Sequence, residues 1–170
     1  MCVTLLTSCD KECANHVDDN EDGICDACSF EYEFLFKLTY DKSGYSLYRV
    51  GAGYQGGNIV IPSTHNGLPV VEIGWGAFKS DYRLTSVVIP EGVKSIGKFA
   101  YYNCTSVASV TLPKSVESIG LYAFSSQLRG RQVETEEEGV FETVDVEFIT
   151  VDGSYAAEYI KNPPTAEVEK

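Results

Sequence analysis

The chain has 170 residues, 44% of them hydrophobic, and a formal net charge of -12. These values predict one compact globular domain with appendages, and no apolar run is long enough for a membrane-spanning helix. Residues 1–30 hold seven acids and one base, whereas residues 31–124 hold seven acids and eight bases. An acidic chain without a basic stripe indicates neither nucleic-acid binding nor electrostatic docking on anionic lipid.

The first nine residues form a short, mostly apolar segment that ends at a cysteine. Leu6-Thr7-Ser8-Cys9 resembles a bacterial lipobox, in which lipid is attached to the cysteine and the preceding residues are removed. An export signal requires positively charged residues before its apolar segment, but residues 1–8 contain none. We therefore expect a truncated export signal with Cys9 as the lipidation site and as the one link to a membrane. The alternative is a disordered apolar N-terminus.

A loop rich in cysteine and aspartate follows, and it matches a calcium-binding pattern. Hard Ca²⁺ prefers several oxygen ligands from a tightly turned chain, and Gly23 stands where such loops turn. Ser29 takes the place of the usual bidentate glutamate, so the expected affinity is weak. The expected ligands are Asp18, Asn20, Asp22, the Ile24 carbonyl and Asp26.

Zinc is the second interpretation of this loop. Two closely spaced pairs, Cys13 with His16 and Cys25 with Cys28, could supply a tetrahedral set of three sulfurs and one nitrogen. Oxidation of thiols in an exported chain counts against zinc, so calcium is favoured, and no other cofactor is expected. In a third alternative the loop is structural, and Cys13 forms a disulfide with Cys25 or Cys28. We expect residues 1–29, the truncated signal and this loop, to form one segment of the chain.

Residues 30–57 predict a β-hairpin cap. Residues 34–40 and 45–50 are rich in strand-forming side chains and flank Asp41-Lys42-Ser43-Gly44, where we expect Gly44 to adopt a positive φ. The hairpin should cover the open edge of the structure that follows. Residues 51–57 contain four glycines and predict a flexible link.

A 23-residue period organises residues 58–125. Residues 86–101 and 109–124 are identical at 8 of 16 positions. One such unit cannot bury its apolar side alone, so the period predicts a solenoid of stacked units with a shared core. We expect the repeated isoleucines, valines and aromatic residues to point inward, and each repeated glycine to fit where a side chain would clash or φ must be positive. The repeated positions are Ile73, Ile96 and Ile119; the glycine after each; Ala77, Ala100 and Ala123; Phe78, Tyr101 and Phe124; Val93 and Val116; and Pro90 and Pro113.

These repeats resemble the BspA-like leucine-rich repeat family. The best copy runs from Val87 through Ile89-Pro90, Ile96-Gly97 and Cys104 to Val107, and residues 58–73 look like that family's widened first unit. The third unit departs from the pattern after Phe124. The resemblance implies a β-rich leucine-rich-repeat solenoid of the α/β horseshoe type with about three 23-residue coils. It also implies a bacterial surface or secreted protein that binds something.

The C-terminal part completes the expected architecture. Residues 126–143 include Glu134 and Glu136-Glu137-Glu138 and predict a solvated acidic loop, with a divalent-cation or basic-partner site as the alternative. Within residues 144–170 we expect a strand over 144–150 and a short helix opened by Gly153-Ser154. Asn162-Pro163-Pro164 should end that helix.

The sequence predicts a binding protein without catalytic activity. Neither His16 nor His65 has a serine or cysteine nucleophile in a recognised context. The expected function is adhesion to an unidentified protein or glycan through variable, exposed positions of the repeats. The alternatives are a structural spacer in a surface lipoprotein and a metal-binding surface protein. The candidate contact residues are Trp75, Arg83, Val88, Lys98, Tyr102, Thr111, Leu121 and Tyr122.

Overall fold

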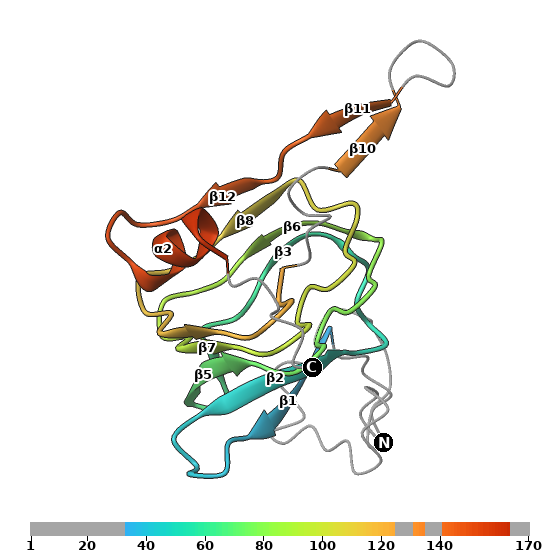
Figure 1. Ribbon diagram of the computed structural model, residues 1–170. Coiled ribbons are helices and arrows are strands. Elements are labelled where there is room, and N and C mark those ends of the chain that lie inside the picture. Colours follow the sequence, from blue (N-terminus) through green and yellow to red (C-terminus); the bar gives the residue numbers. More distant parts are fainter. Residues whose placement is uncertain (1–32, 125–130, 135–140, 164–170) are drawn as a thin grey trace, which may run out of the picture.

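The computed structural model describes residues 33–124, 131–134 and 141–163, and within them the chain winds into two larger sheets, with a separate two-stranded one (Figure 1). One sheet has the order β1 (Phe34–Leu38), β2 (Tyr45–Val50), β5 (Leu68–Ile73), β7 (Ser95–Ile96) and β9 (Ser118–Ile119), with β4 (Thr64–His65) paired to β5. The other has the order β12 (Glu147–Ile149), β8 (Ser109–Thr111), β6 (Leu84–Val88) and β3 (Gly57–Val60).

Parallel pairing between successive turns of the chain follows the 23-residue period. Ser86 lies opposite Ser109 in the β6–β8 pair, and Ile96 lies opposite Ile119 in the β7–β9 pair. Equivalent residues of neighbouring repeats are therefore spatial neighbours, as the period predicts. The fold is strand-rich, and β12 extends the β3–β6–β8 sheet at its far end.

The repeated apolar positions form the core, as predicted. Val93, Val116, Ile96 and Ile119 are buried. The aromatic rings of the 78/101/124 column stack almost parallel, with centroids 5.0 Å apart in the first pair and 5.2 Å apart in the second. This column gives each turn of the chain the same interior spacing as the next.

The repeated glycines allow the turns of the chain to approach closely. A Cβ atom on Gly97 would lie 2.7 Å from the Gly74 carbonyl carbon, and one on Gly120 would lie 2.4 Å from the Lys98 nitrogen. Side chains never approach backbone this closely without displacing it. Of the two reasons expected for these glycines, close approach is therefore the correct one.

The N-terminal hairpin forms as predicted, but its turn differs from the expectation. β1 pairs antiparallel with β2, and β2 pairs parallel with β5, so the hairpin covers the first repeat. The positive φ of 57° belongs to Lys42, not to Gly44. Gly44 is needed because a Cβ there would lie 2.5 Å from the Pro69 carbonyl oxygen.

Tyr54 anchors the glycine-rich segment 51–57 to the core, which its prediction as a flexible link did not include. Tyr54 is buried and packs against Phe34 and Phe78, with ring centroids 6.2 Å apart in each pair. Gly56 supplies a backbone φ of 80° and leaves no room for a Cβ beside Arg83. The glycines therefore shape a fixed turn that carries an aromatic residue inward.

Part of the predicted acidic loop forms strands. β10 (Arg131–Glu134) and β11 (Phe141–Val144) pair antiparallel and project from the body as a ribbon (Figure 1). Valine, phenylalanine and threonine in these segments favour strands, which the neighbouring glutamates obscured in the sequence. The rest of the predicted loop lies outside the described residues.

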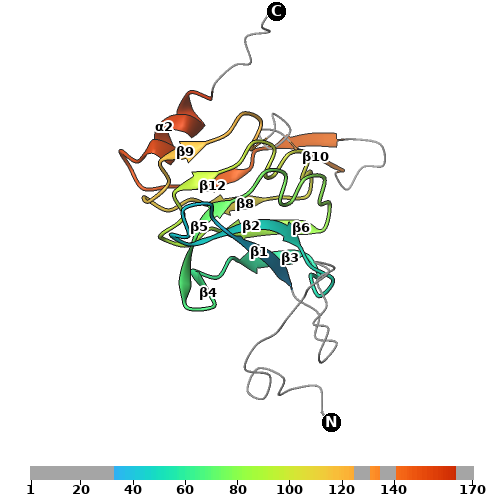
Figure 2. The same ribbon diagram turned by 90° about the horizontal axis from the view of Figure 1, so that it is seen from below.

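A short helix closes the last turn of the chain, as predicted. α2 (Tyr155–Lys161) begins after Ser154, whose side chain accepts a hydrogen bond of 3.1 Å from the Ala157 backbone N–H. Asn162 caps its other end. α2 lies at one end of the stack, whereas β4 and the cap strands lie at the other (Figure 2).

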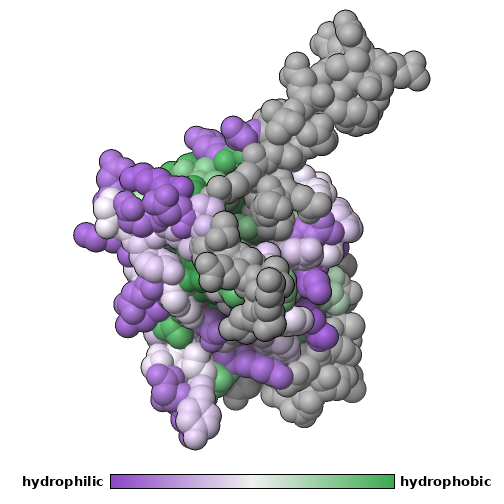
Figure 3. All heavy atoms as spheres, viewed as in Figure 1, coloured by the Kyte–Doolittle hydropathy of each residue, from purple (hydrophilic) through white to green (hydrophobic). Residues whose placement is uncertain are grey.

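The surface seen in Figure 3 is mainly hydrophilic, and hydrophobic residues show as small separate patches. Among the described residues, no helix is long and apolar enough to cross a membrane.

Candidate functional site

An unusual backbone geometry repeats just after each buried isoleucine and glycine. Gly76, Phe99 and Tyr122 occupy equivalent positions and have φ angles of 63°, 61° and 57°. Glycine accepts this left-handed conformation freely, but an aromatic residue there costs about 1–3 kcal/mol. The Phe99 N–H donates a 3.2 Å hydrogen bond to the Leu121 carbonyl, so pairing between neighbouring turns holds the conformation.

This geometry gathers aromatic rings at one corner of the stack. The Phe99 and Tyr122 rings stack with centroids 5.5 Å apart and an interplanar angle of 4°. Trp75 and Tyr102 meet the Phe99 ring edge-on, at centroid distances of 6.1 Å and 5.3 Å. Each such ring contact contributes about 0.5–1.5 kcal/mol, which offsets the backbone strain.

Two lysines complete the cluster. Lys98 Nζ lies 5.0 Å from the Phe99 ring centroid, and Lys79 Nζ lies 5.7 Å from both the Phe99 and the Trp75 centroids. Such cation–π contacts contribute about 0.5–1 kcal/mol each at exposed sites. We call this surface the aromatic corner, and its residues are Trp75, Lys79, Lys98, Phe99, Tyr102 and Tyr122.

The aromatic corner faces solvent. Trp75 is 64% exposed, and Tyr102 and Tyr122 are also exposed. Large rings held rigidly at the surface provide contact area at little cost in side-chain entropy. The corner can therefore supply aromatic packing together with two positive charges.

The structure separates the eight predicted contact residues into three places. Val88 and Thr111 lie opposite each other in the second sheet, where Val60 and Ile149 extend the same row. Val88 and Thr111 do not form one cluster with the other predicted contact residues, because they lie on strands of the second sheet and not at the aromatic corner. Five predicted residues gather at or beside the aromatic corner: Trp75, Lys98, Tyr102, Leu121 and Tyr122.

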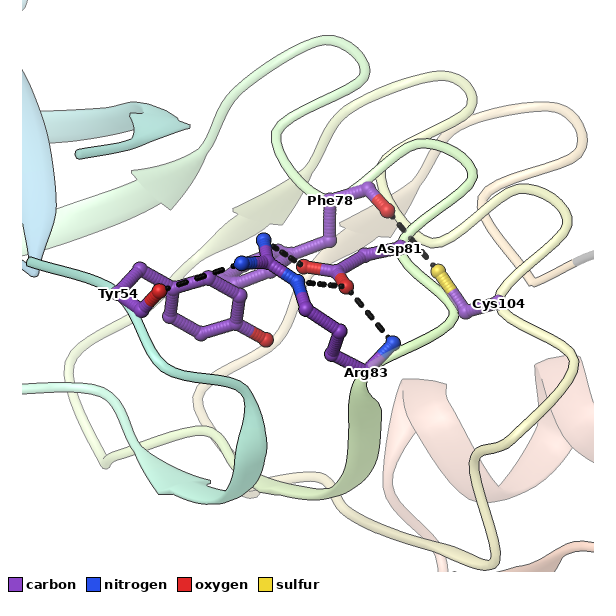
Figure 4. Close-up of polar contacts among 5 residues, drawn as sticks. All are labelled: Tyr54, Phe78, Asp81, Arg83 and Cys104. Carbon is purple, nitrogen blue, oxygen red and sulfur yellow. Dashed lines mark hydrogen bonds and ion pairs between the residues drawn. The ribbon is translucent and has the colours of Figure 1, made fainter. Parts of the chain in front are cut away.

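Arg83, a predicted contact residue, packs on Tyr54 and pairs with Asp81 (Figure 4). Its guanidinium carbon lies 4.8 Å from the Tyr54 ring centroid, and its Nε donates a 3.3 Å hydrogen bond to Asp81 Oδ1. The Arg83 side chain is 58% exposed but that of Asp81 only 6%. The pair therefore neutralises a buried carboxylate.

A buried polar cluster lies beneath this pair. Cys104 occupies the repeat position equivalent to Asp81, and its thiol lies 3.0 Å from the Phe78 carbonyl oxygen. Burial raises the pKa of Cys104 to about 12. Burial and the nearby Asp81 carboxylate also raise the pKa of Tyr54. Both shifts favour the neutral forms, so Cys104 is a buried filler and not an activated nucleophile.

Sequence reasoning missed Lys79 and Phe99. Lys79 is equivalent to Tyr102 in the 23-residue repeat, which could have marked it as a neighbour of that candidate. Phe99 stands at the repeat position of Tyr122. The signal that could have found it was Gly76 at the same repeat position, which indicates a left-handed backbone.

Other predicted sites lie outside the described residues. They include the lipidation site Cys9, the calcium ligands between Asp18 and Asp26, and the zinc ligands between Cys13 and Cys28. The acidic run at residues 136–138 also lies outside. Among the residues that the structure does describe, no group of three or more His, Cys, Asp or Glu side chains could hold a metal ion.

Three solved bacterial structures resemble part of this chain. A leucine-rich repeat protein of Treponema pallidum is 26% identical, with a TM-score of 0.41, over 54% of this chain and 64% of its own. A leucine-rich cell surface protein of Faecalibacterium prausnitzii is 36% identical, with a TM-score of 0.48, over 56% of this chain and 27% of its own. A leucine-rich repeat protein of Bacteroides capillosus is 25% identical, with a TM-score of 0.42, over 51% and 83%. The chain thus spans under two thirds of the first two proteins.

The stacked turns also match a known family of repeats. No curated protein matches the chain significantly. Residues 71–152 match the family described as "BspA type Leucine rich repeat region (6 copies)". The match covers the aromatic corner and the strands from β6 to β12. Residues 71–152 are therefore similar to a BspA-type leucine-rich repeat region.

Proposed function

We propose that the protein is a non-catalytic binding module of the bacterial cell surface that recognises a protein or glycan through the aromatic corner. The observation that carries this proposal is the strain at Phe99 and Tyr122. Both residues hold a left-handed backbone that suits glycine, and both place a ring in the exposed cluster. Strain of this kind concentrates at functional sites.

The repeat match and the composition support the same function. Leucine-rich repeat regions suggest protein-binding modules. Tryptophan and tyrosine dominate the binding energy of many protein interfaces, and both occur at the corner. The lipobox-like sequence before Cys9 supports a surface location with a lipid anchor. A calcium site in the loop between Asp18 and Asp26 is part of the proposal, with zinc as the alternative.

An array of purified extracellular proteins and glycans, probed with the labelled chain, tests this function. We expect Trp75→Ala to weaken binding of any array partner about 30-fold, because hot-spot residues contribute about 2 kcal/mol or more. Tyr40→Ala is the matched control, since Tyr40 is 105% exposed and lies in the hairpin turn of the cap.

Two outcomes would contradict the proposal. If no array member binds the wild-type chain, the spacer alternative replaces the binding module. If a partner binds Trp75→Ala as tightly as wild type but loses affinity for Val88→Lys, recognition lies on the row of Val60, Val88, Thr111 and Ile149 instead.

A further inference from the structure

The aromatic corner is a positive patch on an acidic protein. The chain carries a formal net charge of -12, yet the corner contains Lys79 and Lys98 and no acidic residue. Among described residues, Lys94 forms an ion pair with Glu117, and Lys161 forms one with Glu158. Lys79 and Lys98 have no such carboxylate partner in that part of the structure. Their charges are available to a ligand.

The donor set of the corner favours an anionic ligand. Its polar groups are two ammonium groups, the Trp75 indole N–H and the hydroxyls of Tyr102 and Tyr122. Ammonium and indole groups only donate hydrogen bonds, and no carboxylate or amide of the corner accepts them. Hydrogen bonds from charged donors to carboxylates are stronger than those between neutral groups.

The shape of the corner favours a macromolecule. The exposed rings of Trp75, Tyr102 and Tyr122 stand on the surface of successive turns. Small-molecule sites, by contrast, are concave and enclose most of the ligand. An exposed aromatic cluster of this kind is typical of a hot spot in a protein–protein interface.

The ring at the centre of the corner has little free face for a sugar. The Tyr122 ring stacks on the Phe99 ring with centroids 5.5 Å apart, and the Lys98 ammonium lies 5.0 Å from the Phe99 centroid. The Lys79 ammonium lies 5.7 Å from the Phe99 centroid and equally far from that of Trp75. Sugars stack flat on open aromatic faces, whereas a carboxylate meets these lysines first.

From these observations we infer that the partner of the aromatic corner is an acidic segment of a protein. Its carboxylates pair with Lys79 and Lys98, and an apolar or aromatic side chain between them packs against Trp75 and Tyr102. This inference rests on the proposed function and names the class of partner. Charge complementarity of this kind speeds association and selects against basic partners.

Direct binding of defined polymers to the purified chain tests the partner class. The probes are a random copolymer of glutamate and tyrosine, polyglutamate, and hyaluronate as an acidic polysaccharide. We expect the copolymer to bind most tightly, polyglutamate less tightly and hyaluronate least. Affinity for the copolymer should fall as salt rises, because salt screens exposed charges.

Two matched double variants distinguish binding through the lysines of the aromatic corner from nonspecific binding through any exposed lysines. Lys79→Ala with Lys98→Ala should weaken copolymer binding about tenfold, as loss of two exposed ion pairs predicts. Lys94→Ala with Lys114→Ala removes the same charge from exposed lysines outside the corner, and it should leave binding unchanged. Circular dichroism of both variants checks that the fold is intact.

The outcomes distinguish this inference from the proposed function. Hyaluronate binding as tight as copolymer binding, or equal losses in the two double variants, would overturn the acidic-protein inference. If Trp75→Ala abolishes binding of an array partner while the Lys79/Lys98 double variant keeps it, the inference fails but the binding module stands. If neither change affects any ligand, both fail.

Discussion

The interior columns and the aromatic corner are parts of the same turns of the chain, yet they vary differently from repeat to repeat. Phe78, Tyr101 and Phe124 keep an aromatic ring in every turn; the first two are buried, and Phe124 is partly buried against the core. Three residues before each of these rings, the equivalent positions hold Trp75, Lys98 and Leu121, which are chemically unrelated. Burial fixes the first set, whereas exposure leaves the second free to acquire a function.

The largest expected effect separates these two regions by stability. Ile96→Ala should lower the free energy of unfolding by about 2–5 kcal/mol, because it removes a buried side chain that the stack cannot refill. Urea denaturation followed by circular dichroism measures this. Phe99→Gly should cost less, since loss of ring contacts is offset by relief of the left-handed strain. Equal losses in the two variants would contradict the distinction.

A smaller effect is expected where the two regions meet. Gly97→Ala should destabilise the fold by about 1–3 kcal/mol, because the added Cβ would lie 2.7 Å from the Trp75 nitrogen. The same displacement should move the Trp75 ring and weaken binding at the aromatic corner. Thermal unfolding and array binding of one variant measure both effects. Unchanged melting would show that the turns can separate without loss.

The smallest effect concerns repeated positions that are exposed. Lys94 Nζ lies 3.9 Å from Glu117 Oε1, with both side chains mostly exposed. The pair should contribute about 0.2–1 kcal/mol. Lys94→Glu should destabilise the protein, and addition of Glu117→Lys should restore stability. A double-mutant cycle in low and high salt measures the coupling. Zero coupling in low salt would contradict the expected contribution.

Much of the fold could be predicted because equivalent residues recur at a constant spacing. The spacing alone placed Ile96 beside Ile119, and it also puts Glu91 and Lys114 one period apart. The second contact differs in detail, since Glu91 accepts a hydrogen bond of 3.1 Å from the Lys114 backbone N–H. Side-chain charge suggested the pair, but the backbone of the neighbouring turn offered the nearer donor.

What the sequence did not predict depends on contacts outside the repeat. Tyr54 occurs once, in a glycine-rich segment, and only the folded neighbours Phe34 and Phe78 show why it is buried. The left-handed Phe99 was also hidden, because phenylalanine itself disfavours that conformation. Its φ is set by the neighbouring turn, which accepts its N–H at the Leu121 carbonyl.

The constant register of the stack also has a consequence for how the chain folds. Ser86 pairs with Ser109 and Ile96 with Ile119, so successive repeats meet after closing loops of one length. The entropy lost in closing a loop depends on its length, and it is therefore nearly the same at each of these steps. The pairs Ile73–Ile96 and Ile96–Ile119 therefore have no advantage of proximity over each other along the chain. Folding can begin at whichever neighbouring pair packs best and then spread turn by turn in both directions.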